Sequence, residues 1–310
     1  MRILVVGVDG SPSSLGALQW ASDQVGAGGE LYVLVATTPT PELADHRPKP
    51  GSIDDLFMLE HELDRVSQAS VRDRVGSVTV QAVAGAASDA LRDAALAHEA
   101  DAIVLGTHMS ALGMPKRVGS TLRDLMADLP CPLVVVPDPL GPGVPHGPIV
   151  VGAGHGPATD AAVCWSAARA EDGAQALAIV RATGEGPVFQ VDGWLSFVAY
   201  YIDPSVRDEW TQEDLAEFAR RAQAVTSTDI SIATEALQGL PATQLVDESE
   251  HASLLVIGQH RSWGRGNRHV AQPLHHALTH AQCPVVVVPA ADDAADDADG
   301  DDPNDTDPAE

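Results

Sequence analysis

A lone carboxylate, Asp9, follows the apolar run at residues 3–8 and stands directly before Gly10 and Ser11. Ser11-Pro12 is a preferred helix start, because a serine side chain caps free backbone N–H groups and proline fits the first turn. Free N–H groups at a helix start bind anions, and phosphate above all. This order of residue types therefore indicates a place where a phosphorylated ligand meets a carboxylate.

A second group with the same chemistry lies in "GTHMSALGMPKRVGST", residues 106–121. Gly106 lets the chain leave a strand closely, and Gly119, Ser120 and Thr121 open a further helix, where hydroxyls add donors. Lys116 and Arg117 add positive charge nearby. Taken singly, each motif is better explained by ordinary capping, with Asp9 capping its own helix and Gly119-Ser120 forming a plain turn.

The elements that must position these residues alternate along the chain. Strands are predicted at 2–8, 30–37, 78–84, 102–107 and 132–136, and helices at 13–25, 53–74, 87–99 and 120–128. The apolar runs are continuous rather than alternating, which indicates strands buried on both faces of a parallel sheet. Such a sheet binds ligands beyond the carboxyl ends of its strands, where strand order reverses, and Asp9 is predicted at that point.

The chain repeats this pattern. "DAIVLGTHMS" (101–110) matches "ASLLVIGQHR" (252–261), and "LPCPLVVVPD" (129–138) matches "AQCPVVVVPA" (281–290), both at an offset of 152 residues. A Pro/Gly-rich linker is predicted at 138–148. We therefore expect an α/β protein with two tandem, doubly wound, Rossmann-like domains, each with a five-stranded, mostly parallel sheet. They are copy one, residues 1–137, and copy two, residues 149–290.

The net charge of the chain excludes some classes of binding partner. The formal net charge is -26, and the last twenty residues, 291–310, hold ten acids and no base, which predicts a disordered tail. Strong acidity argues against binding to nucleic acid. No apolar run reaches the length of a membrane span, and no signal peptide is visible, so we expect a cytoplasmic protein. The acidic, lysine-poor composition fits a high-salt, halophilic cytoplasm, although GC-rich coding also favours arginine over lysine.

These features together resemble a tandem universal stress protein. The family's nucleotide motif is G-x2-G-x9-G-[ST], with an aspartate at the end of the first strand, and Asp9, Gly106, Gly119 and Ser120 match it. Met109 stands at the second glycine, where a side chain crowds a triphosphate. The resemblance implies ATP, with Mg, as the ligand of copy one. Ala36 is the match to an adenine-pocket residue at the end of the second strand, and His108 lies in the loop beside the cleft.

The resemblance leaves three functional interpretations open. The first is a regulator of the stress response that binds an adenine nucleotide. The second is a nucleotide-free scaffold for protein interactions, which Met109 favours. The third is a weak ATPase, for which the sequence offers no nucleophile–base pair and no general base.

Copy two has lost more of the motif. Gly154 stands in place of Asp9, Arg261 falls on the second glycine, and Ala271-Gln272 replaces Gly119-Ser120. We expect copy two to keep the fold without the ligand. It carries an aromatic-rich segment, 188–218, expected either to pack on the sheet and fill the vacant cleft or to bind a partner.

Each copy ends in a short, uncharged strand, "PLVVVP" and "PVVVVP". Exposed apolar edge strands invite pairing, and the family commonly dimerises through this strand. We therefore expect the two copies to form an intramolecular pseudo-dimer. A homodimer through another face stays open.

Overall fold

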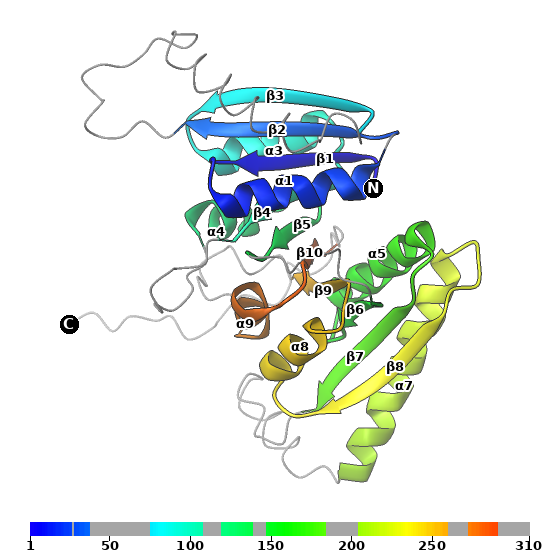
Figure 1. Cartoon of the computed structure of the whole chain (residues 1–310). Helices are drawn as coiled ribbons and strands as arrows, with labels where there is room; N and C mark the ends of the chain where they lie inside the picture. The colour runs from blue at the N-terminus through cyan, green and yellow to red at the C-terminus, as the bar shows by residue number, and fades with distance from the viewer. Residues whose placement is uncertain are drawn as a thin grey trace, which may run out of the picture.

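The computed structural model describes residues 1–26, 28–37, 75–107, 119–138, 147–183, 204–259 and 272–290. They form one ten-stranded sheet in the order β3-β2-β1-β4-β5-β10-β9-β6-β7-β8. Within each copy all neighbouring strands are parallel. The two halves therefore repeat one doubly wound topology, in which strand order reverses beside the first strand (Figure 1).

Copy one follows the predicted alternation closely. Its strands are β1 (Ile3–Val8), β2 (Glu30–Thr37), β3 (Ser77–Ala84), β4 (Ala102–Gly106) and β5 (Leu133–Val136). Its described helices are α1 (Pro12–Val25), α3 (Ala87–Ala97) and α4 (Ser120–Met126). The predicted helix at 53–74 lies outside the described residues.

Copy two repeats the same order. Its strands are β6 (Ile149–Gly152), β7 (Leu177–Thr183), β8 (Ile232–Gln238), β9 (Leu254–Gln259) and β10 (Val285–Pro289). Its described helices are α5 (Pro157–Gly173), α7 (Pro204–Val225), α8 (Pro241–Ser249) and α9 (Gln272–His280). No described helix is long and apolar enough to cross a membrane.

The helices cover the sheet in two layers, because its strands are apolar on both faces. On one face α1, α5 and α7 enclose a core that includes Leu18, Ala167 and Leu215. On the other face α3, α4, α8 and α9 enclose a second core that includes Leu91 and Leu125. Both cores run across both copies, so the described elements pack as one body.

The last strands of the two copies join the halves. β10 pairs antiparallel with β5, with Val285 opposite Val135 and Val287 opposite Leu133, and all four side chains are at most 2% exposed. This is the only antiparallel pairing among the described strands. Either copy alone would expose the apolar edge of its last strand. In the full chain, the pairing of β5 with β10 covers both edges.

Part of the aromatic segment falls on described residues. Residues 204–218 lie in α7, the helix that connects the parallel neighbours β7 and β8. Phe218 is buried against the sheet together with Leu215 and Ala222. This part of the predicted insertion is therefore a regular covering helix of the fold. Residues 188–203 lie outside the described part of the chain.

Candidate functional site

A cavity of about 540 Å³ opens beside the carboxyl ends of β1 and β4 in copy one. Parallel strands present their carboxyl ends at one edge of the sheet, and the strand-order reversal beside β1 leaves room there between helices. The cavity brings together the predicted site residues that are fully described, apart from Gly10. These are Asp9, Ser11, Gly106, Gly119, Ser120 and Thr121.

Asp9 follows β1 and shapes the turn into α1. Its Oδ1 accepts hydrogen bonds from Ser11 N at 3.0 Å and from Ser11 Oγ at 2.6 Å. Gly10 between them has φ of 80°, a conformation that favours glycine. Ser11 is the N-cap of α1 and accepts from Ser14 N at 3.2 Å, as the sequence predicts. Asp9 therefore organises the helix start and also presents a carboxylate on the cavity wall.

Gly106 ends β4 and is required by packing. A Cβ built there would lie 2.2 Å from the Ser13 carbonyl oxygen in the first turn of α1. Its counterpart in copy two, Gly258, shows the same approach, with a built Cβ 2.0 Å from the Ala158 carbonyl oxygen. The two glycines are alike because the sheet and its first helix meet closely in both copies.

Gly119 differs from Gly106. Its backbone, at φ −60° and ψ 157°, suits any residue, and a built Cβ would meet no heavy atom of the described residues within 4 Å. The fold therefore makes no demand for glycine at this position, yet Gly119 lines the cavity with Ser120 and Thr121. A small residue there keeps the backbone of the α4 start open to a ligand.

Three predicted residues are placed only in part or not at all. Ala36 lies in β2 with its backbone in register with Val83, a cavity residue, but its side chain is outside the described part. His108 and Met109 lie outside the described residues, as do Lys116 and Arg117.

The cavity has an apolar part that motif reasoning missed. Leu34, Val83, Leu91, Leu105 and Leu122 line it. They come from β2, β3, α3, β4 and α4, and they occupy one face of the sheet. The alternation of strand side chains could have placed Leu34 and Val83 there, because both point to the α3 side.

The described wall is rich in hydroxyls and carries negative charge. Ser11, Ser13, Ser14, Ser120 and Thr121 supply hydroxyls, and Asp9 and Asp124 supply carboxylates. Among the described lining residues there is neither lysine nor arginine. The wall therefore suits a ligand that combines an apolar ring with several hydroxyl groups. The described part of the wall offers no positively charged side chain.

Copy two has a different arrangement at the equivalent end of β6. Gly154 N donates to Thr159 Oγ1 at 3.1 Å, as Asp9 N donates to Ser14 Oγ at 3.3 Å in copy one. The carboxylate of Asp9, however, has no counterpart at Gly154. His155 follows, and its ring lies within hydrogen-bond distance of the Arg181 guanidinium.

Arg181 also forms an ion pair with Asp214 of α7 at 2.5 Å. Partial desolvation, and then the nearby guanidinium of Arg181, lower the pKa of His155. This Arg–His–Asp group ties the end of β6 to β7 and α7. Asp9 follows β1 in copy one. At the equivalent end of β6 in copy two, the chain instead forms contacts within the protein.

Comparison with known proteins agrees with the repeated architecture. The sequence matches the universal stress protein family twice, over residues 1–137 and 146–289. It is 25% identical to universal stress protein Rv2623 of Mycobacterium tuberculosis, over 92% of this chain and 95% of the relative. It is 24% identical to universal stress protein Rv2005c of the same organism, over 92% and 96%.

A crystal structure of a universal stress protein from Archaeoglobus fulgidus shares the fold. It superposes with a TM-score of 0.62 and 15% identity, covering 93% of this chain and 98% of that chain. The likeness therefore extends through both copies. The chain belongs to the universal stress protein family and carries the family's domain twice.

Proposed function

We propose that copy one binds an adenine nucleotide in this cavity and that the protein acts as a nucleotide-responsive regulator of the stress response. One observation carries the proposal. The four residues that match the family's nucleotide motif, Asp9, Gly106, Gly119 and Ser120, all lie on the wall of one cavity, although 111 positions separate the first from the last. Family membership supports the stress-related role.

The described wall fits the nucleoside part of such a ligand. The volume of about 540 Å³ lies within the range of small-molecule sites. The leucine and valine side chains offer apolar contact to a purine ring. The Asp9 carboxylate can accept hydrogen bonds from ribose hydroxyls, because an ionised carboxylate is a strong acceptor.

The phosphates and Mg²⁺ would lie toward α4. Backbone N–H groups and hydroxyls at Ser120 and Thr121 are the donors on that side of the wall. Mg²⁺ takes oxygen ligands, and Asp9 and Asp124 are the carboxylates that the described wall could offer it. Lys116 and Arg117, which precede the α4 start in the sequence, are bases that could balance phosphate charge.

The second candidate is a nucleotide-free scaffold. It is favoured by the two carboxylates and the lack of a basic side chain on the described wall, since both oppose a triphosphate. Met109, at the second glycine of the motif, also favours the scaffold, because a side chain there crowds a triphosphate. Under this interpretation the cavity takes a nucleoside or stays without a ligand, and binding to a partner protein supplies the function.

Paired substitutions separate the two candidates. Asp9→Ala removes the carboxylate, and Gly119→Val fills the approach to the α4 start. We expect each to weaken ATP-Mg binding by at least about tenfold, the scale of one lost or blocked contact. Ala271→Val, at the copy-two position equivalent to Gly119, is the matched control and should leave affinity unchanged.

Equilibrium dialysis with labelled ATP and Mg²⁺ on the full chain gives the affinities, and thermal melting checks that each variant is folded. Unchanged affinity in both Asp9→Ala and Gly119→Val would overturn the proposed site. Absence of binding by the unaltered chain would favour the scaffold.

A further inference from the structure

Copy one does not build the cavity wall alone. Two of the lining residues, Leu278 and Thr279, belong to α9 of copy two. Both are buried, with 6% and 5% of their surface exposed. Copy two keeps only Gly258 of the four matching motif residues, yet it contributes directly to the surface of the copy-one cavity.

The pairing of the last strands explains how α9 reaches this place. Antiparallel pairing of β5 with β10 brings the two copies together across a local two-fold relation. Leu278 lies 152 positions after Met126 and so takes the equivalent place on α9 that Met126 takes on α4. Both side chains belong to the apolar core on the α3 and α4 side of the sheet. α9 therefore shares this core with α4, and residues of both helices line the cavity.

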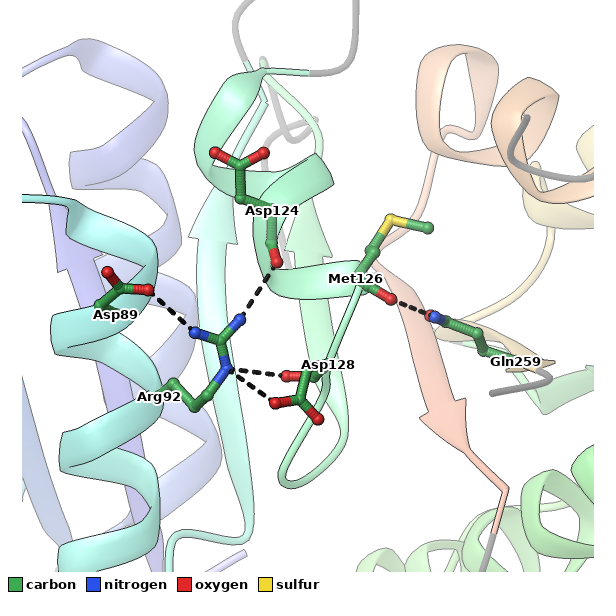
Figure 2. A network of polar contacts seen from close by, with 6 residues as sticks. All are labelled: Asp89, Arg92, Asp124, Met126, Asp128 and Gln259. Atoms are coloured by element: carbon green, nitrogen blue, oxygen red, sulfur yellow. Dashed lines mark hydrogen bonds and ion pairs between the residues drawn. The ribbon is translucent and has the colours of Figure 1, made fainter. Parts of the chain in front are cut away.

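Polar contacts hold α4 from both copies (Figure 2). Arg92 of α3 donates to the carbonyl oxygens of Asp124 at 3.1 Å and Asp128 at 3.0 Å, and pairs with Asp89 at 3.0 Å. On the other side, Gln259 of β9 donates through Nε2 to the Met126 carbonyl oxygen. Gln259 is only 5% exposed.

The Asp124 and Met126 carbonyls belong to the last turn of α4, and the Asp128 carbonyl lies two residues beyond the end of the helix. Carbonyls at a helix C-terminus lack partners within the helix. Arg92 satisfies two of them from within copy one, and Gln259 satisfies another from copy two. Copy two thus fixes the end of α4 opposite to the end that lines the cavity.

We propose that copy two completes the copy-one site, and that Leu278 and Thr279 are wall residues that set which nucleotide the cavity accepts. The inference rests on the proposed nucleotide site and adds a specificity-determining surface to it. Leu122 and Asp124 of α4 line the same cavity as Leu278 and Thr279, so we place this surface on the α4 side of the ligand, where the phosphates are proposed. Changes in side-chain size at Leu278 should therefore act more strongly on ATP-Mg than on adenosine.

The test compares the unaltered full chain with Leu278→Phe, Leu278→Ala and His275→Phe by titration calorimetry, using ATP-Mg and adenosine as probes. Leu278→Phe adds bulk at the wall and should weaken ATP-Mg by at least about tenfold. Leu278→Ala removes contact surface and should weaken it severalfold. His275→Phe places the same aromatic ring on an exposed position of α9 and serves as the control, with unchanged affinity.

The outcomes distinguish the inference from the proposed function. If the unaltered chain binds neither probe, the nucleotide site is wrong and the inference falls with it. If the unaltered chain binds ATP-Mg and both Leu278 variants stay within about twofold of it, the inference alone is overturned. If Leu278→Phe does not melt cooperatively, Leu278→Ala decides the question. Equal weakening by His275→Phe would also overturn the inference, because the effect would then belong to α9 as a whole.

Discussion

At the scale of single residues, Gly106 and Gly119 of the nucleotide motif have different roles. Gly106 is demanded by the fold, because the Ser13 carbonyl oxygen occupies the space that a side chain would need. Gly119 has an ordinary extended backbone, and no other described residue approaches the position of a Cβ there. Copy two keeps the first as Gly258 and replaces the second with Ala271. This is the pattern expected if packing preserves one glycine and a ligand preserves the other.

Alanine substitutions distinguish a glycine that packing requires from one that a ligand requires. Gly106→Ala and Gly258→Ala should each lower the free energy of unfolding by about 1–3 kcal/mol, the usual cost of overpacking. Gly119→Ala should leave it unchanged or raise it by up to about 1 kcal/mol, because alanine restricts the unfolded chain. Urea unfolding followed by circular dichroism measures all three. Equal destabilisation by Gly119→Ala and Gly106→Ala would show that the fold also requires the glycine of the α4 start.

At the scale of elements, the joint between the copies depends on two short strands. β5 and β10 meet in three adjacent pairs of apolar residues, and all six side chains are almost completely buried. The same pairing brings α9 to α4, so the joint also shapes the cavity wall. Its disruption should therefore affect both stability and ligand binding.

Placing a charged side chain in the β5–β10 pairing tests how much this contact contributes to stability. Val135→Asp or Val287→Asp buries a carboxylate without a partner, which should cost about 3–5 kcal/mol or unfold the chain. Val225→Asp, at a side chain that is 48% exposed, is the control and should change stability by less than about 0.5 kcal/mol. Thermal melting and gel filtration report the results. Stable, compact Val135→Asp and Val287→Asp variants would contradict the buried pairing.

The sequence predicts the elements well and the cavity only in part. The described strands and helices of copy one lie within about two residues of the predicted ranges, because continuous apolar runs and cap residues act locally. Asp9, Gly119 and Ser120 could be found for the same reason. Leu278 and Thr279 could not, because their role depends on how two copies pack around β5 and β10. That contact connects residues more than 150 positions apart and has no local signature.

The charge of the whole molecule is its most unusual property. The chain has 44 acidic and 18 basic residues, and the part before the tail still has 34 acids. Several of the bases are already engaged, as in the pairs of Arg221 with Asp160 and Glu217. Repulsion among the remaining carboxylates should destabilise the compact state at low salt.

Salt should therefore stabilise the protein. Screening shortens the reach of charge from about 10 Å at 0.1 M to about 3 Å at 1 M, so the melting temperature should rise from low salt to molar KCl. Deletion of 291–310 should change this temperature little, because the tail's composition favours disorder. Scanning calorimetry over a series of KCl concentrations measures the effect. A melting temperature independent of KCl would count against adaptation to high salt.

The central claim is that one of the two copies binds a nucleotide and the other completes its site. Titration calorimetry of the unaltered full chain with ATP-Mg tests it most directly, because the stoichiometry distinguishes one site from none or two. We expect a single site per chain. Two equivalent sites would show that copy two keeps a functional cleft without the Asp9 carboxylate, and no heat of binding at any ATP-Mg concentration up to the millimolar range would contradict the nucleotide site itself.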